Sequence, residues 1–183
     1  KLSKSITAQI KTLGMPGGQF EVSLKPRESQ KPHPHGLEQV EFLVTANPGQ
    51  PAKPLQKVAS GGELSRISLA IQVTCAQQTK LGTLIFDEVD VGIGGGVAEI
   101  VGRLLRTLGG TRQVMCVTHQ PQVAAQGHHH LHVQKELKKH STSTTLKQLN
   151  TDEKVVEIAR MLGGLELTEH TLKHAQEMVQ KVQ

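Results

Sequence analysis

Between Glu63 and Thr118 the chain alternates between two hydrophobic spacings, and this alternation constrains the fold more than any other feature of the sequence. Apolar residues at helical spacing predict helices over Glu63–Gln78 and Val97–Leu108. Short apolar runs predict buried strands over Thr83–Phe86 and Gln113–Thr118. Because strands that alternate with helices are typical of α/β layer architectures, we expect an α/β fold.

The segments on either side of this region carry further patterns. Helical spacing predicts an opening helix over Leu2–Leu13, which Gly14 and Pro16 end. The other expected elements are strands over Gln19–Lys25 and Val40–Ala46, a hairpin of His130–Glu136 with Thr144–Leu149, a helix capped by Thr151 that ends at Gly163, and a last helix capped by Thr168.

The composition excludes several classes of protein. The chain has 183 residues, of which 36% are hydrophobic, so it has room for one domain or one lobe of a larger domain and can bury a core. Trp and Tyr are absent and there are three Phe, so the core is expected to be aliphatic, and aromatic stacking on nucleic-acid bases is nearly excluded. The apolar runs are too short to cross a bilayer, and the polar and apolar alternation of the first residues leads us to expect no signal peptide.

The charge and the cysteines add two expectations. The net charge of +5 indicates a mild preference for polyanions, which by itself does not predict nucleic-acid binding. Cys75 and Cys116 both lie within apolar sequence, which predicts reduced core thiols in a cytosolic protein. The chain begins with Lys1 in the middle of a helical pattern, so we expect a piece of a longer protein.

The segment Ser60–Arg66, SGGELSR, is the first candidate site. Ser60 and Glu63 have the spacing of a capping box, and an amphipathic helix follows at once. Gly61 and Gly62 weaken the start of this helix. Two glycines at this position are understandable if another group must come close to the backbone, because glycine has no side chain in the way. A glycine-rich helix start offers free N–H groups and a positive dipole end, which suits a phosphate. The alternative is a capped helix with a flexible entry.

The segment Leu84–Asp90, LIFDEVD, is the second candidate. It places two adjacent carboxylates at the carboxyl end of a strand, where ligands bind in open α/β sheets. Asp87 would hold Mg²⁺ through its water shell, and Glu88 would orient and deprotonate an attacking water. The alternative is a charged strand exit that faces solvent.

His119 is the third candidate, because it follows the second buried strand. If the two strands are parallel neighbours, His119 lies at the same sheet edge as Asp87 and Glu88. A neutral imidazole there can form a hydrogen bond with a phosphate oxygen or with the attacking water. Most single histidines after a strand have no such role.

Taken together, the three segments resemble the C-terminal lobe of an ABC-type P-loop ATPase head. SGGELSR resembles the signature motif, LIFDE resembles Walker B with its catalytic Glu88, and His119 resembles the switch histidine. Transporter subunits of that superfamily usually read DEP after the strand, whereas DEVD resembles the SMC-like ATPases of chromosome maintenance and DNA repair. This resemblance implies that residues 17–183 form the C-terminal lobe and that residues 1–16 end a coiled-coil helix.

The resemblance also implies an activity and partners. ATP with Mg²⁺ would lie between two heads of a homodimer, where the partner head contributes Ser60, Gly61, Gly62 and Glu63 in trans. Hydrolysis would gate contact with DNA ends or double-strand breaks, in the cytoplasm at the nucleoid and without a membrane. The alternatives are a silent clamp or dimerisation module that keeps the fold, and another ABC-type ATPase.

Two departures from the family pattern limit these expectations. No G-x-x-x-x-G-K-[ST] phosphate loop occurs, so the Walker A lobe is absent and we expect the chain alone to be inactive as an ATPase. Gly94 stands where many relatives have an Asp after Walker B. What replaces that Asp is open.

Two further clusters have competing interpretations. His128, His129, His130 and His132 could suggest a zinc site, but three consecutive histidines on a strand cannot all point one way. The basic residues near the tip of the expected hairpin could touch DNA phosphate, although a solvated tip is the simpler interpretation. These basic residues are Lys135, Lys138, Lys139, His140 and Lys147.

Overall fold

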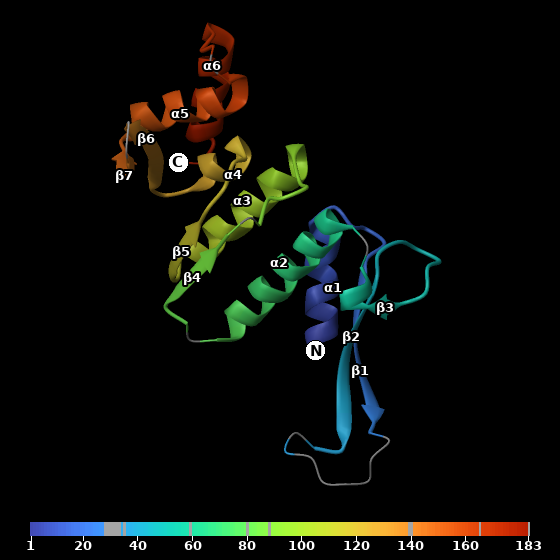
Figure 1. The fold of residues 1–183 in the computed structure, drawn as a ribbon. Helices are drawn as coiled ribbons and strands as arrows, with labels where there is room; N and C mark the ends of the chain where they lie inside the picture. The colour runs from blue at the N-terminus through green and yellow to red at the C-terminus, as the bar shows by residue number, and fades with distance from the viewer. Residues whose placement is uncertain are drawn as a thin grey trace. The chain divides into compact units, whose positions relative to one another are not determined.

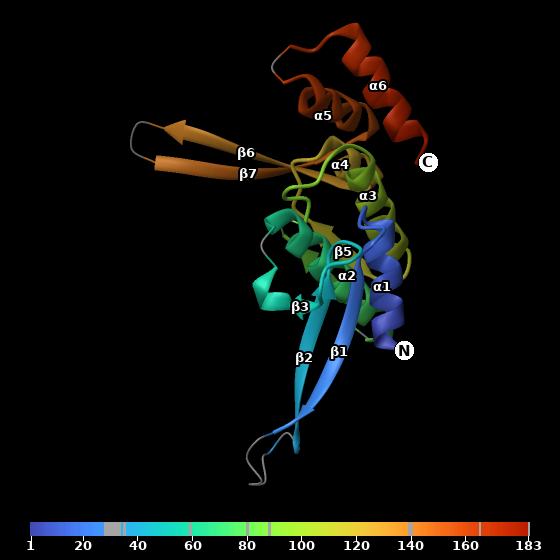
Figure 2. The ribbon, with the colours of Figure 1, turned by 90° about the vertical axis from the view of Figure 1, so that its right-hand side faces the viewer.

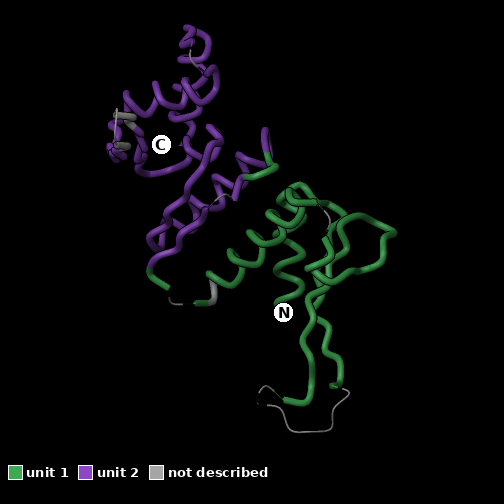
Figure 3. The backbone as a smooth tube through the Cα atoms, in the orientation of Figure 1, with its two compact units in different colours: residues 1–82, 91–93 green, residues 83–90, 94–183 purple. Residues whose placement is uncertain are grey.

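A computed structural model of the chain describes residues 1–27, 34, 36–58, 60–79, 81–87, 89–138, 141–164 and 166–182 (Figure 1, Figure 2). The chain divides into two compact units (Figure 3). Unit 1 comprises Lys1–Gly82 with Val91–Ile93, and unit 2 comprises Thr83–Asp90 with Gly94–Gln183. In the described part of the chain, no helix is both long enough and apolar enough to cross a membrane.

Unit 1 contains two helices beside a small antiparallel sheet. Its elements are α1 (Leu2–Thr12), β1 (Gln19–Pro26), β2 (Glu38–Thr45), β3 (Lys53–Pro54), a 3₁₀ turn (Leu55–Lys57) and α2 (Gly61–Gln78), and the strand order is β1-β2-β3. Helix α1 packs against α2 and β1. The Thr7 hydroxyl links α1 to β1, because it accepts a hydrogen bond from the Phe20 N–H at 3.0 Å. The core between these elements is aliphatic, with Ile6, Ile10, Ile67 and Val73 fully buried.

The hairpin β1–β2 has one apolar face. Its register pairs Phe20 with Val44 and Leu24 with Val40, so these side chains share a face. Phe20 and Val44 are buried at the base of the hairpin, whereas Leu24 and Val40 are exposed toward its far end.

Unit 2 is built around two parallel strands. Its elements are β4 (Thr83–Phe86), α3 (Gly95–Gly109), β5 (Gln113–Cys116), α4 (Pro121–Gln126), β6 (His130–Lys138), β7 (Ser141–Leu149), α5 (Thr151–Gly163) and α6 (Glu169–Gln180). Strand β4 pairs with β5 in parallel, and α3 packs against β5 and α4. The antiparallel hairpin β6–β7 extends away from the helices (Figure 2).

The helices at the end of unit 2 share a small core. Helices α5 and α6 pack on each other and on α4, and the buried residues between them are Ala125, Ile158, Ala159, Ala175 and Val179. Thr168 caps α6 as expected, since its Oγ1 accepts a hydrogen bond from the Thr171 N–H. The prediction that Thr151 caps α5 is wrong by one residue. Asn150 is the cap, because its side chain and that of Glu153 form a reciprocal capping box.

One face of the parallel pair is covered and the other is open. Phe86 and Cys116, which pair in the β4–β5 register, lie on the less exposed face. Ile85 and Met115 pair on the opposite face and are 69% and 46% exposed, and Val117, two residues further on, is 61% exposed. Parallel strands are usually covered on both faces, so this open apolar face is unusual.

Most of the elements predicted from the sequence are present. The α/β pattern between α2 and β5 is confirmed, and the observed bounds of these elements differ from the expected ones by at most two residues. No sequence pattern predicts α4, a helix of six residues that starts at Pro121. Helix α1 lies within unit 1, and its assignment as the end of a coiled coil stays a prediction.

Candidate functional site

The carboxyl ends of β4 and β5 meet at one sheet edge. The parallel register pairs Phe86 with Cys116, so the residues that follow both strands emerge side by side. The Val117 N–H donates to the Phe86 carbonyl at 2.9 Å and extends the pairing past the end of β5. Asp87 is exposed directly after β4. Glu88, the predicted general base, lies outside the described residues.

A third acidic residue of the segment Leu84–Asp90 forms the centre of this edge. The Asp90 side chain is fully buried, and its Oδ2 accepts hydrogen bonds from the Thr118 hydroxyl and from two backbone N–H groups. The N···O distances are 3.1 Å to His119 and 3.2 Å to Gln120. Asp90 therefore joins the turn after β4 to the loop after β5. No local sequence pattern predicts this role of Asp90, although its position at the end of DEVD is a signal.

His119 lies at the surface of the same loop. Its side chain is 66% exposed, and its Nδ1 lies 3.5 Å from Asp90 Oδ1. Its Nε2 lies 3.3 Å from the side-chain nitrogen of Gln120. The structure thus brings the loop of His119 to the strand end that carries Asp87, and the contact between them runs through Asp90.

The buried part of this edge is electrostatically unfavourable for another negative charge. Burial raises the pKa of the Cys116 thiol to about 12, and the nearby carboxylates of Asp90 and Asp87 add to the effect. Cys116 therefore stays a thiol at neutral pH. The prediction of two core thiols is wrong, because Cys75 is exposed and Cys116 is only half-buried. Helix α2 instead buries the stripe that contains Ile67, Ala70 and Val73.

The start of α2, in unit 1, is more exposed than the buried edge of β4 and β5. Ser60 is its cap, and the Ser60 Oγ accepts a long hydrogen bond of 3.4 Å from the Glu63 N–H. A side chain added at Gly61 would meet nothing within 4 Å. Gly62 is different, because a Cβ there would lie 3.1 Å from the Gly92 carbonyl oxygen. The backbone that lies close to Gly62 is therefore that of Gly92 in the same chain. Gly92 itself has a φ of +71°, a conformation that favours glycine.

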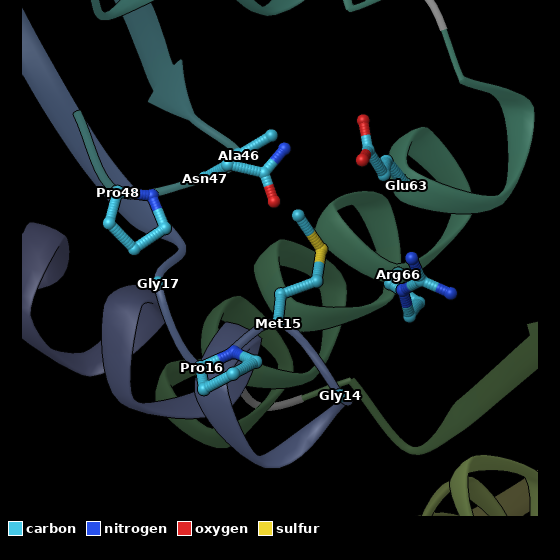
Figure 4. Close-up of a pocket in the computed structure, with 9 residues that line it drawn as sticks. All are labelled: Gly14, Met15, Pro16, Gly17, Ala46, Asn47, Pro48, Glu63 and Arg66. Carbon is cyan, nitrogen blue, oxygen red and sulfur yellow. The ribbon is translucent and has the colours of Figure 1, made fainter. Parts of the chain in front are cut away.

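Glu63 and Arg66 line a cavity of about 400 Å³ within unit 1 (Figure 4). Met15 and Asn47 line it from two loops, and Pro16 and Pro48 form part of its apolar wall. The Nε of Arg66 is buried and has no hydrogen-bond partner among the described residues. These two charged residues of the segment Ser60–Arg66 therefore border a cavity of their own unit.

The histidine cluster does not form a metal site in the described part of the chain, where no three His, Cys, Asp or Glu side chains are grouped to hold an ion. His128 and His129 are exposed, and His130 is half-buried. Burial lowers the pKa of His130, and the Lys154 ammonium lowers it further. The Nε2 of His132 lies 3.9 Å from Glu157, which forms a two-point ion pair with Arg160.

Only part of the basic patch on the hairpin can be placed. Lys135 is exposed on β6, and Lys147 on β7 forms an ion pair of 2.5 Å with Glu153. Lys139 and His140 lie outside the described residues, as does the side chain of Lys138. DNA contact by this patch stays the alternative to a solvated tip.

The chain is similar to DNA repair proteins over its whole length. It is 50% identical over 182 residues to the DNA repair protein RecN of Xylella fastidiosa (strain 9a5c), and this match covers 100% of the chain and 33% of that protein. It is also 50% identical over 179 residues to RecN of Vibrio cholerae, covering 98% of the chain and 32% of that protein. The chain spans about a third of the length of these relatives. No family model matches the chain.

Solved structures show the fold. The Smc head domain of Pyrococcus yayanosii aligns with a TM-score of 0.65 at 17% identity, over 86% of this chain and 28% of that one. A chain from work on the ATP-driven dimerization and DNA-stimulated activation of SMC ATPases aligns with a TM-score of 0.62 at 16% identity, over 90% of this chain and 92% of that one. The fold is that of an SMC ATPase head, which confirms the resemblance inferred from the three motifs.

Proposed function

Because the chain matches the RecN DNA repair proteins over its whole length and has the fold of an SMC ATPase head, we propose that it is the C-terminal half of an ATP-hydrolysing head. In this proposal the head acts in the repair of double-strand breaks, where hydrolysis gates its contact with DNA. The observation that carries the proposal is the shared edge of β4 and β5, at which Asp87 and His119 follow the two parallel strands and Asp90 joins their loops. The chain would work in the cytoplasm.

The residues at this edge suit a nucleotide with Mg²⁺. Asp87 offers an exposed carboxylate, the hard oxygen ligand that Mg²⁺ prefers, and it would hold the ion through a water. Bound Mg²⁺ would neutralise negative charge on the phosphoryl group that is transferred. Glu88 would act as general base, and His119 would contact the attacking water or the γ-phosphate.

The start of α2 suits a phosphate offered by a second head. Ser60 and Gly61 are exposed, and the space beside Gly61 is open, so a ligand can approach the first N–H groups of the helix. Gly62 and Glu63 complete the segment that would contact the γ-phosphate in trans. Two copies of the head would then enclose ATP between them, and neither copy would be competent alone.

The open face of β4–β5 supports the proposal that a second lobe completes the head. Ile85, Met115 and Val117 expose apolar surface where parallel strands are normally covered. A segment that carries a phosphate loop, which this sequence lacks, would cover that face and supply the lysine for the β- and γ-phosphates. We therefore expect ATPase activity only when this chain is joined to such a segment.

Two substitutions test the proposal in a protein that contains this chain together with a phosphate-loop segment. Glu88→Gln should retain ATP binding but slow hydrolysis by roughly 10²–10⁴-fold, the usual effect of removing a positioned general base. Ser60→Arg should leave ATP binding intact but block dimerisation and hydrolysis, because the bulky cation would prevent the second head from closing.

Mixing the two variants gives the decisive measurement. A heterodimer has one site with both lesions and one site with neither, so turnover in the mixture should exceed the sum of the separate variants. Ser60→Ala is the matched control, since it removes the cap hydroxyl without adding bulk. Normal hydrolysis by Ser60→Arg would overturn the assignment in trans, and normal turnover by Glu88→Gln would show that another residue activates the water. ATP binding without turnover in the unsubstituted protein would favour the silent clamp.

A further inference from the structure

The two oxygens of the Asp90 carboxylate have different surroundings. Oδ2 accepts hydrogen bonds from the Thr118 hydroxyl and from the N–H groups of His119 and Gln120. Oδ1 is buried and has no hydrogen-bond partner among the described residues, and the Nδ1 of the His119 imidazole lies 3.5 Å from it. Because a buried carboxylate oxygen without a donor is unfavourable, a proton on Nδ1 facing Oδ1 is stabilised.

The other ring nitrogen of His119 leads to the same protonation pattern. Its Nε2 lies 3.3 Å from the side-chain nitrogen of Gln120, and an amide nitrogen can only donate. Nε2 must then accept, so the proton of the neutral ring lies on Nδ1. Two contacts on opposite sides of the imidazole thus select one tautomer.

We propose that Asp90 is a positioning residue that holds His119 as its Nδ1-protonated tautomer and fixes the loop Thr118–Gln120 through Oδ2. The consequence is that Nε2 carries the accepting lone pair of the ring, which in this structure faces the Gln120 amide at 3.3 Å. This inference rests on the proposed function for its catalytic meaning. There it favours His119 as the acceptor that orients the attacking water, which would replace the Gln120 amide at Nε2, over His119 as a donor to the γ-phosphate.

The direct test is the ¹⁵N spectrum of the histidine side chains in the 183-residue chain. At about pH 8, where an ordinary imidazole is neutral, long-range ¹H–¹⁵N correlations distinguish the two tautomers. The His119 signals, identified by their loss in His119→Gln, should show protonated Nδ1 and unprotonated Nε2. A His119 ring protonated mainly at Nε2 in the unsubstituted chain would overturn the proposal without any variant.

Asp90→Asn tests whether the Asp90 carboxylate determines the tautomer of His119. The asparagine oxygen can still accept from the loop, whereas its amide group presents a donor toward His119, so the tautomer should shift toward protonated Nε2. Asp87→Asn is the matched control, because it removes a carboxylate from the same edge that the structure does not place in contact with the ring. Amide peak dispersion verifies that each variant is folded. An unchanged His119 tautomer in folded Asp90→Asn would contradict the proposal.

The catalytic part is measured separately, in a protein that includes a phosphate-loop segment. Asp90→Asn should lower kcat by about 10–100-fold, as loss of a group that orients a reacting residue typically does, and leave KM nearly unchanged. In the His119→Ala background the same substitution should have little further effect. Full additivity of the two substitutions would overturn the positioning role. If neither protein hydrolyses ATP, the proposed function fails, while the tautomer measurement still decides the role of Asp90.

Discussion

The start of α2 and the carboxyl ends of β4 and β5 contribute to the proposed site in opposite ways. At the start of α2, Ser60 and Gly61 are exposed, and the cap hydrogen bond is long at 3.4 Å. At the strand ends, the fully buried carboxylate of Asp90 accepts three hydrogen bonds from one loop. The start of α2 leaves its backbone accessible to a ligand, whereas the strand ends hold their side chains in place by internal hydrogen bonds.

This difference matches the roles proposed for the two regions. A surface that contacts a nucleotide bound to another head must stay accessible, so few internal contacts can constrain it. Groups that act on the nucleotide of their own head must be held in place before the ligand arrives, because preorganised groups need no rearrangement during the reaction. The comparison therefore predicts different responses to labelling and to substitution.

The largest difference should appear in thiol labelling, because α2 and the strand-end region contain one cysteine each. Cys75 is exposed on α2, whereas burial beside two carboxylates raises the pKa of Cys116, at the end of β5, to about 12. At pH 8 only about one Cys116 in 10⁴ would carry the reactive thiolate. We expect iodoacetamide to modify Cys75 about a thousandfold faster than Cys116, as followed by peptide mass spectrometry.

Labelling in denaturant is the control for this experiment. Both cysteines should react at similar rates in the unfolded chain, where neither burial nor the carboxylates act on Cys116. The labelling rate of Cys116 in the folded chain should still be rising above pH 10. Rapid labelling of folded Cys116 near neutral pH would show that the strand ends are as open as the surface of α2 at Cys75.

The second difference concerns stability. Asp90→Ala removes the buried carboxylate that accepts three hydrogen bonds. The Gln120 N–H keeps Thr118 Oγ1 as an acceptor at 3.0 Å, so we expect the free energy of unfolding to fall by about 2 kcal/mol. Ser60→Ala removes one exposed cap and should cost about 1 kcal/mol or less. Urea unfolding followed by far-UV circular dichroism measures both, since the chain has no Trp or Tyr for fluorescence. Equal losses for the two variants would remove the distinction between the regions.

The sequence could predict the elements of both regions, but it could not predict the bonds within the strand-end region. The helical spacing along α2 and the apolar runs of β4 and β5 are local patterns, and they predicted the element types correctly. The partners of Asp90 lie 28–30 residues further along the chain, so no local spacing relates them to it. Only the parallel register of β4 and β5 brings the two loops together.

Two errors of the sequence-based predictions have similar physical causes. Asn150 and Thr151 are both polar residues at a helix start, and only the reciprocal bonds between Asn150 and Glu153 decide which of them is the cap. Cys75 lies at helical spacing from Ile67 and Ile71, but the packing of α1 against α2 buries a neighbouring stripe instead. Periodicity predicts that a helix has a buried face, whereas tertiary contacts decide where its edges lie.

The smallest effect is expected at the two glycines that start α2, where the stabilities of Gly62→Ala and Gly61→Ala are compared. Gly62→Ala would place a Cβ 3.1 Å from the Gly92 carbonyl oxygen, so the backbone must shift, and we expect a loss of about 1–2 kcal/mol in the free energy of unfolding. Gly61→Ala is the matched control, because a side chain there meets nothing within 4 Å, and it should change stability by less than about 0.5 kcal/mol or increase it slightly. The same urea titration measures both variants.

If Gly62→Ala is as stable as Gly61→Ala, the internal contact with Gly92 does not require the second glycine. Loss of nucleotide-dependent dimerisation in that stable variant would then assign Gly62 to the approach of the partner's phosphate. An unstable Gly62→Ala would instead show that the two adjacent glycines serve different purposes, with Gly62 needed for folding and Gly61 left open for the partner.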